Sequence, residues 1–326
     1  FFNCKYINII WNNFKFNKKK SLSILMKQKI LISTVGTEGH VIHAITIYDH
    51  LKNEHEVTIC TDVRGLKYLD INKFKIFEID TPKLNRSILL PFTILKVFFL
   101  TIKSLLLLKK EKIQILISTG GYMSLPLCLA GKILNIKIFL LEPNMTIGRA
   151  NKFFLNFCEK IICYSNNING LPSKFKKKIE ISSPFIRKQD YEKKFKENNN
   201  EIFTIMIVGG SQGAQIFDEI IHESIVKISK IKPLKIIHQT SQKKVNFFKK
   251  FYSDNNLESI VFNFDNNLDM LISQSDLCIT RAGASSLAEI AHLNVPFIAI
   301  LLPTAKDNHQ LENANYYRDK DCCWII

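Results

Sequence analysis

The sequence predicts an α/β fold built from two parallel sheets, one in each half of the chain. Short apolar runs rich in β-branched residues alternate with segments of helical period, as in sheets covered by helices. The first run of each half ends in a glycine turn, and a polar, asparagine-rich stretch within 182–201 separates the halves. At 326 residues, of which 46% are hydrophobic, the chain is long enough for two cores.

The predicted strands are apolar runs bounded by turn residues. They cover residues 29–34, 57–61, 74–79, 113–118, 137–141, 160–164, 202–208, 234–239, 259–263, 276–280 and 297–302. Ligands in open parallel sheets bind at the carboxyl ends of the strands. The turns that follow the strands are therefore the segments to search for a site.

Composition argues against several other classes of protein. The formal charge is +16, but lysine dominates it, and lysine lacks the bidentate fork of arginine, so nucleic acid is not predicted as a partner. The eight cysteines show no Cys-x-x-Cys spacing, so we predict neither a disulfide framework nor a metal site. We expect them to be buried small hydrophobes in a reducing cytoplasm.

The two ends of the chain differ from the repeating pattern. Residues 1–25 carry Lys18, Lys19 and Lys20 with scattered aromatics and no signal-peptide pattern, so we expect an extension that precedes a first domain starting at Met26. The last residues, 322–326, form an apolar, strand-like run with no closing helix. We expect a second domain that is incomplete at its C-terminus.

The glycine turn at 209–214 gives the strongest functional signal. Gly209, Gly210, Ser211, Gln212, Gly213 and Ala214 lie between the strand 202–208 and a helix that begins near Gln215. Such a turn leaves backbone N–H groups and the positive end of a helix dipole free, which is typical of phosphate sites, although a bare strand-to-helix turn remains an alternative. Neither Gly-x-Gly-x-x-Gly nor a Gly-Lys-Ser/Thr follows, so dehydrogenases and P-loop proteins are disfavoured.

The first half opens with a second glycine turn, Gly36-Thr37-Glu38-Gly39-His40. Val41, Ala44, Ile45, Tyr48 and Leu51 then mark one face of a helix. An imidazole at this helix start, His40, has the chemistry of a general base, and a histidine that only caps or packs is the alternative.

Three further turns follow predicted strands. Gly120-Gly121-Tyr122 and Glu142-Pro143-Asn144 belong to the first half, and Arg281 to Glu289 belong to the second. Small residues at 282–288 permit close approach of a ligand to the backbone, and the Glu289 carboxylate can accept both hydroxyls of a ribose. An ordinary amphipathic helix with an exposed glutamate is the alternative.

Together with the segment 307–314, Asp-Asn-His-Gln-Leu-Glu-Asn-Ala, these motifs occur in the order found in one family. From about Met26 to its last residue, the chain resembles the MurG family of glycosyltransferases. The resemblance implies a GT-B fold, in which two Rossmann-like domains with parallel sheets face a cleft. Residues 26–186 would form the domain for the acceptor and the membrane, and residues 187–326 the domain for UDP-GlcNAc.

The resemblance also implies the reaction. An inverting transferase would move GlcNAc from UDP-GlcNAc to the muramyl 4-hydroxyl of undecaprenyl-linked lipid I and form lipid II in peptidoglycan synthesis. It would need neither a cofactor nor a metal and would be a peripheral enzyme on the cytoplasmic face of the bacterial inner membrane. A catalytically impaired nucleotide-sugar-binding homologue and a UDP-GlcNAc epimerase of the same fold are the alternatives.

Site residues follow from the family's motifs by position. His40 is the candidate base, with Glu142 second. The residues implied to bind UDP-GlcNAc and its phosphates are Thr37, Glu38, Gly39, Asn144, Arg187, Gly209, Gly210, Ser211, Gln212, Gly213, Asp265, Ala284, Ser285, Ser286, Leu287, Ala288, Glu289 and Gln310. Among them, the main chain of Asp265 would contact uracil, Glu289 would accept hydrogen bonds from the ribose hydroxyls, and Gln310 would contact the GlcNAc hydroxyls.

Two positions depart from the family's pattern. The family has glycine where this chain has Glu38, and we expect a glutamate at a positive-φ site there, at a cost of about 1 kcal/mol. His43 stands where proline is usual.

The segment 87–108 approaches the length of a transmembrane helix, but Pro91, Lys96 and Lys103 interrupt it. We expect 87–112 to lie on an anionic membrane surface, with Lys109, Lys110 and Lys112 near the headgroups. A buried core helix is the alternative, because apolar period does not separate the two.

Overall fold

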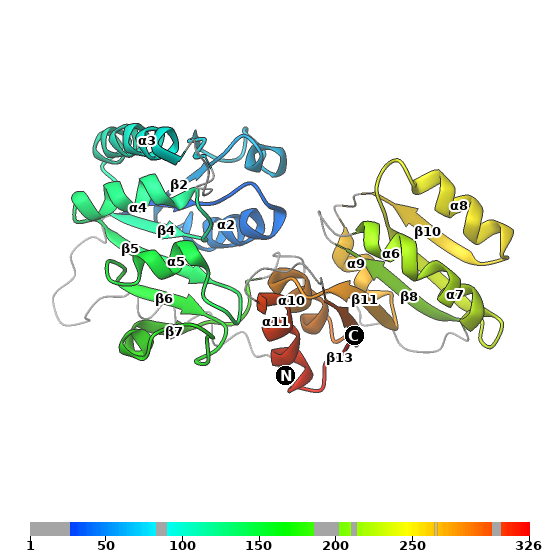
Figure 1. Ribbon diagram of the computed structural model, residues 1–326. Helices are drawn as coiled ribbons and strands as arrows, with labels where there is room; N and C mark the ends of the chain where they lie inside the picture. Colours follow the sequence, from blue (N-terminus) through cyan, green and yellow to red (C-terminus); the bar gives the residue numbers. More distant parts are fainter. Residues whose placement is uncertain are drawn as a thin grey trace. The chain divides into compact units, whose positions relative to one another are not determined.

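The computed structural model describes residues 27–82, 90–185, 202–209, 214–263, 265, 267–301 and 308–326. The chain divides into two compact units, 1–188 and 189–326. Each unit carries its own parallel sheet, and helices flank both sheets (Figure 1).

The first unit contains a seven-stranded parallel sheet in the order β3-β2-β1-β4-β5-β6-β7. Its strands are β1 (Lys29–Ser33), β2 (Glu56–Thr61), β3 (Ile76–Glu78), β4 (Ile115–Ser118), β5 (Lys137–Glu142), β6 (Lys160–Cys163) and β7 (Ile179–Ile181). Its helices are α2 (Glu38–Leu51), η2 (Gly65–Tyr68), α3 (Leu90–Lys110), α4 (Ser124–Ile133), α5 (Arg149–Phe154) and η3 (Ser173–Lys178).

The central strands of this sheet are buried along almost their whole length. Ile30, Leu31 and Ile32 of β1 are each 0% exposed, because helices cover both faces of the sheet. On α2, Val41, Ala44 and Leu51 point into the core, as the helical period predicts.

The second unit contains a six-stranded parallel sheet in the order β10-β9-β8-β11-β12-β13. Its strands are β8 (Phe203–Val208), β9 (Leu234–Gln239), β10 (Glu258–Phe262), β11 (Leu277–Arg281), β12 (Phe297–Ile300) and β13 (Cys323–Ile325). Its helices are α6 (Ala214–Ile220), α7 (His222–Ser229), α8 (Val245–Asp254), α9 (Leu268–Ser273), α10 (Ala284–His292) and α11 (His309–Arg318).

Both sheets have the strand order of a Rossmann-like fold, so the predicted fold class is confirmed. The order reverses between β1 and β4 in the first sheet and between β8 and β11 in the second. These reversals are the places where ligands bind in such sheets. The turns after β1, β4, β8 and β11 are the glycine and small-residue turns that the sequence singles out.

Each predicted strand is present, with ends displaced by up to two residues, and the C-terminal run forms β13, which pairs in parallel with β12. One strand, β7, was not predicted. It consists of only three residues, Ile-Glu-Ile, none of which is buried, so the run is too short for its pattern to indicate a strand.

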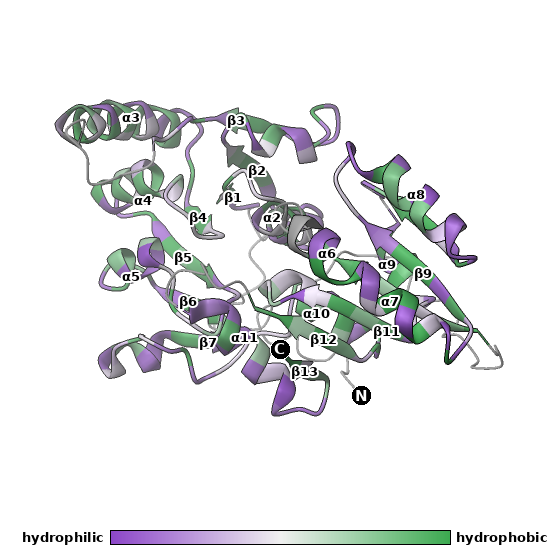
Figure 2. Cartoon of the chain, turned by 45° about the vertical axis from the view of Figure 1, so that its right-hand side comes forward, coloured by the Kyte–Doolittle hydropathy of each residue, from purple (hydrophilic) through white to green (hydrophobic). Residues whose placement is uncertain are grey.

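Helix α3 has an unusual distribution of side chains. The residues that face the protein include Thr101 and Ser104, whereas Phe92, Phe98, Phe99 and Leu106 are exposed. The Thr101 hydroxyl donates a hydrogen bond to the Val97 carbonyl oxygen at 2.8 Å, so this buried hydroxyl has a partner within the helix. The apolar character of α3 is visible in Figure 2. Within the described residues, Pro91–Lys110 is the one helix long and apolar enough to cross a membrane, judged by length and composition alone.

Candidate active site

The first candidate site lies at the carboxyl edge of the first sheet. The neighbouring strands β1, β4 and β5 end there. His40 and Gly120 follow β1 and β4, and Glu142 is the last residue of β5. The fold therefore gathers at one edge three motifs that are about 20 to 100 residues apart in the sequence.

His40 lies in the first turn of α2, and its ring is anchored to β4. Its Nδ1 donates a hydrogen bond to the Thr119 carbonyl oxygen at 2.6 Å. Burial lowers the pKa of His40 below the ordinary value of 6.5, and this hydrogen bond opposes the shift only in part. At neutral pH the ring is therefore uncharged, with its proton on Nδ1 and the lone pair of Nε2 free to accept a proton.

Glu142, the second candidate base, is buried at the end of β5. It is 2% exposed, and both of its oxygens accept hydrogen bonds from the loop that follows β5. Oε1 accepts from the backbone and side-chain nitrogens of Asn144 at 3.3 and 3.1 Å, and Oε2 accepts from Gly148 N at 2.6 Å and Asn151 Nδ2 at 3.0 Å. Burial raises the pKa of Glu142, and these bonds oppose that rise. The geometry favours a carboxylate that positions the loop over one that takes the acceptor's proton.

The turn at 36–40 corrects one expectation. Glu38 is the first residue of α2, so its backbone is helical and the expected positive φ is wrong. A carboxylate in the first helical turn is favourable toward the helix dipole. Gly36 is needed for space instead, because a Cβ there would lie 2.3 Å from the Arg64 Cβ and 2.3 Å from the Asp62 Oδ1.

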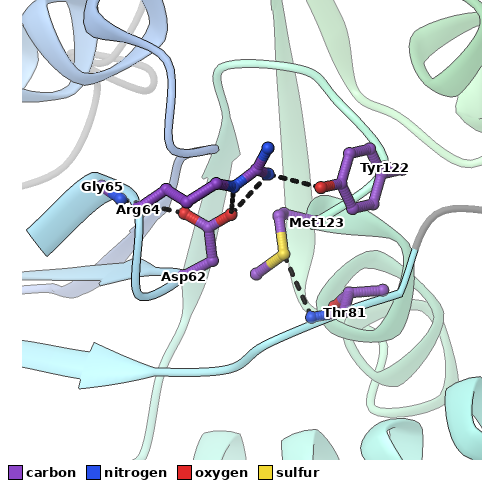
Figure 3. A network of polar contacts seen from close by, with 6 residues as sticks. All are labelled: Asp62, Arg64, Gly65, Thr81, Tyr122 and Met123. Atoms are coloured by element: carbon purple, nitrogen blue, oxygen red, sulfur yellow. Dashed lines mark hydrogen bonds and ion pairs between the residues drawn. The ribbon is translucent and has the colours of Figure 1, made fainter.

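Asp62 and Arg64, which the sequence reasoning missed, join the turn after β2 to the turn after β4 (Figure 3). The buried Asp62 Oδ2 accepts hydrogen bonds from Arg64 Nε at 2.9 Å and Nη2 at 2.6 Å, and its Oδ1 accepts one from Gly65 N at 3.0 Å. Arg64 Nη2 also donates to the Tyr122 hydroxyl. Their position, as charged residues directly after the buried strand β2, was the sequence signal that could have identified them as site residues.

The second candidate site lies at the carboxyl edge of the second sheet, where β8 and β11 end. Gly209 is buried directly after β8, and α10 begins three residues after β11. Ser285, Ser286 and Glu289 are half-buried on α10, whereas Leu287 and Ala288 are 0% and 2% exposed and pack into the core. Those two residues therefore present only their backbone to a ligand.

Helix α11 contributes to the same edge. Asn313 donates from Nδ2 to the Ala282 carbonyl oxygen at 3.1 Å, which ties α11 to the turn after β11. Gln310, one turn earlier on α11, is 9% exposed. Asp265 lies after β10, and its Oδ1 accepts a hydrogen bond from Asn267 N at 2.7 Å.

Several predicted site residues lie outside the described part of the chain. They are Arg187, Gly210, Ser211, Gln212 and Gly213, and the side chain of Glu38 is also outside it. In the residues that are described, no three His, Cys, Asp or Glu side chains group so as to hold a metal ion.

Two Rossmann-like units with ligand-type turns at their strand reversals have the architecture of the GT-B fold, and the family comparisons give the class, that of GT-B glycosyltransferases. Residues 30–163 match the N-terminal domain of glycosyltransferase family 28, and residues 204–326 match its C-terminal domain. The solved structure of Acinetobacter baumannii MurG shares the fold, with a TM-score of 0.73 and 24% identity, and covers 92% of this chain and 86% of that one.

Two relatives carry the same name, UDP-N-acetylglucosamine--N-acetylmuramyl-(pentapeptide) pyrophosphoryl-undecaprenol N-acetylglucosamine transferase. The protein of Pelagibacter ubique is 46% identical over 303 residues, covering 92% of this chain and 85% of its own length. The protein of Rickettsia felis is 33% identical and covers 92% and 86%. The chain belongs to glycosyltransferase family 28 and, within it, to the MurG family.

Proposed function

We propose that the chain transfers GlcNAc from UDP-GlcNAc to the muramyl 4-hydroxyl of lipid I, with inversion at the anomeric carbon, to form lipid II. The observation that carries the proposal is the 46% identity, over 92% of the chain, to a relative named for this transfer. The chain is a UDP-GlcNAc-dependent glycosyltransferase of peptidoglycan synthesis, and UDP-GlcNAc and lipid I are its substrates.

The chemistry is a direct displacement. The muramyl 4-oxygen forms a bond to the anomeric carbon, the bond from that carbon to the diphosphate oxygen breaks, and UDP leaves with the electron pair. The hydroxyl proton passes to a base, which we assign to His40 Nε2 because the Thr119 carbonyl oxygen holds the other ring nitrogen as a donor. Glu142 then acts on the loop that carries Asn144, which we assign to substrate contact.

The donor roles fall to the second unit. We assign Glu289 to the ribose hydroxyls, Gln310 to the GlcNAc hydroxyls, and Arg187 with residues 209–214 to the diphosphate. Backbone N–H groups at such a turn stabilise the charge that develops on the leaving diphosphate, so the proposal requires no cofactor. Ser285 and Ser286, half-buried on α10, and the backbone of Ala284, Leu287 and Ala288 complete the nucleotide contacts.

We further propose that α3 lies on an anionic membrane surface and that the enzyme is peripheral on the cytoplasmic face of the inner membrane. The exposed fractions of Phe92, Phe98, Phe99 and Leu106 are 71%, 58%, 59% and 66%, which is a large apolar face for a surface helix. Lys96, Lys103, Lys109 and Lys110 are exposed on the same helix, and they suit anionic headgroups. We assign no role to nucleic acid.

Two measurements on the purified chain test the function. UDP-GlcNAc is titrated calorimetrically, and transfer to a short-chain lipid I analogue is then followed by release of UDP. The proposal expects binding and formation of a lipid II analogue. Binding without transfer would favour an impaired binding protein, and release of an epimerised sugar would favour an epimerase.

A further inference from the structure

Asn151, to which no role has been given so far, lies buried between Glu142 and the candidate base. It belongs to the first turn of α5 and is 3% exposed. Its Nδ2 donates to the Leu141 carbonyl oxygen at 2.9 Å and to Glu142 Oε2 at 3.0 Å. Both partners are acceptors, so the end of the amide that faces them has to be the NH2 group.

The other end of the amide is consequently fixed as an oxygen. Among the described residues, Asn151 Oδ1 is buried and has no hydrogen-bond donor. A buried acceptor without a donor is costly, and such groups in a native fold call for a functional explanation. Glu142 is what imposes this arrangement, because a buried carboxylate accepts only from the NH2 end of its neighbour.

The Asn151 amide and the His40 ring both lie close to Gly120. A Cβ on Gly120 would lie 3.4 Å from His40 Cε1, 3.6 Å from Asn151 Nδ2 and 3.9 Å from Asn151 Oδ1. Gly120 has a φ of +95°, a conformation that also disfavours any side chain at this position. The His40 ring and the Asn151 amide therefore both lie next to Gly120.

We propose that Asn151 is a positioning residue for the transfer, which holds its amide oxygen beside the His40 ring and so favours the imidazolium that forms when His40 takes the acceptor's proton. This inference rests on the proposed function. The negative end of the amide dipole stabilises a positive ring, and the Cε1–H group of an imidazolium is a weak donor to such an oxygen.

The other described titratable groups near the ring are His43 and Glu142. His43 lies one turn along α2, and burial lowers its pKa to about 3, so it is uncharged at neutral pH. Glu142 lies behind the amide and holds it in place. The Thr119 carbonyl oxygen contributes from β4 and accepts the Nδ1 hydrogen. Asn151 is thus a neutral group that lies, like the His40 ring, next to Gly120. Its replacement changes the local field without changing the net charge.

The test measures the protonation of His40 directly. The chemical shift of its Cε1–H is followed by NMR across pH in the whole chain without substrate, for wild type, Asn151→Leu and Glu142→Gln. Leucine keeps the branched shape of asparagine but removes the amide oxygen together with the NH2 group, so we expect the His40 titration to move to lower pH. Glu142→Gln removes the buried charge that fixes the amide, so we expect a shift in the same direction.

Leu155→Val is the matched control, because it loosens packing at the end of the same helix without changing a polar group. We expect it to leave the His40 titration unchanged. With the lipid I analogue, Asn151→Leu should lower kcat about tenfold while the KM for UDP-GlcNAc stays within about twofold.

An unchanged His40 titration in folded Asn151→Leu, or in folded Glu142→Gln if the first variant does not fold, would overturn the inference. A shift of equal size in Leu155→Val would also overturn it, because any loosening of α5 would then have the same effect. Failure of the wild type to transfer GlcNAc would instead overturn the proposed function, and the titration would still decide the effect of Asn151 on the ring.

Discussion

The Nδ1 of His40 donates to the carbonyl oxygen of Thr119 at 2.6 Å, which joins the first turn of α2 to the carboxyl end of β4. This contact fixes the tautomer, so the nitrogen that remains free is the one without a proton. The same edge of the sheet carries the Glu142 loop, and the second unit carries a separate set of residues that we assign to the nucleotide.

Replacement of His40, the proposed base, should strongly reduce transfer without affecting donor binding. We expect His40→Gln to lower kcat by about 10²- to 10⁴-fold, the range for loss of a general base, while UDP-GlcNAc affinity measured by calorimetry stays within about twofold. His50→Gln, at the exposed end of the same helix, is the control and should retain full activity. Because burial lowers the pKa of His40, the wild-type rate should fall only below pH 6.5, as the ring becomes protonated.

His43 should make the stability of the protein depend on pH. Burial lowers its pKa to about 3, and its Nε2 accepts a hydrogen bond from the Tyr164 hydroxyl at 3.1 Å. An unfolded histidine has a pKa near 6.5, so the unfolded state binds more protons below that pH. The stability that a neutral His43 confers is therefore complete above about pH 6.5 and is lost as the pH falls toward about 3.

Thermal unfolding of wild type and His43→Gln between pH 4 and 8 measures this effect. We expect the variant to lose less stability than the wild type as the pH falls, by at most about 1.4 kcal/mol per pH unit. Equal slopes for the two proteins would show that His43 does not carry the effect.

Gly36 should tolerate no side chain. A Cβ there would lie 2.7 Å from Gly65 N, in addition to its close contacts with Asp62 and Arg64. We expect Gly36→Ala to lower the free energy of unfolding by about 1–3 kcal/mol, the usual cost of overpacking. In Gly283→Ala the nearest atom would be the Ser286 Oγ at 3.8 Å, so its free energy of unfolding should change by less than about 0.5 kcal/mol.

Glu289 should carry much of the donor affinity. Two charge-assisted hydrogen bonds to ribose hydroxyls would be lost in Glu289→Ala, so we expect UDP-GlcNAc to bind roughly 100-fold more weakly. Glu258→Ala changes an exposed glutamate that pairs with Lys235 in the same unit, and its affinity should equal that of the wild type. Equal affinities in all three proteins would contradict the assignment of Glu289.

Binding to anionic vesicles should depend on α3. The rings of Phe98 and Phe99 are 5.9 Å apart and both exposed, so we expect Phe98→Ser combined with Phe99→Ser to weaken sedimentation with vesicles at least tenfold. Phe247→Ser is the control, because Phe247 is 59% exposed in the second unit. Loss of binding in the control, or retention in the double variant, would contradict the proposal.

Much of the fold could be predicted from the sequence because the strands are buried on both faces. β1, β4 and β8 are apolar throughout and bounded by glycine or polar turns, which is a strong local signal. β7 was missed because it is short, half-exposed and preceded by lysines, so its pairing with β6 depends on tertiary contacts.

The site was only partly predictable for a related reason. His40, Glu142 and Glu289 stand in motifs directly after strands or at helix starts, where a local pattern marks them. Asn151 and Arg64 act through partners on other strands, and nothing in their neighbouring residues marks those partners. The strain expected at Glu38 was wrong because the turn ends at Thr37 and Glu38 is already the first residue of α2.

The product of the wild-type reaction decides whether the chain is an inverting transferase for lipid I. UDP-GlcNAc labelled with ¹³C at the anomeric carbon is incubated with a short-chain lipid I analogue, and the product is analysed by NMR. We predict one UDP released per GlcNAc transferred and a β linkage to the muramyl 4-oxygen. Retention of the α configuration, an epimerised sugar, or no transfer under conditions where UDP-GlcNAc binds would contradict it.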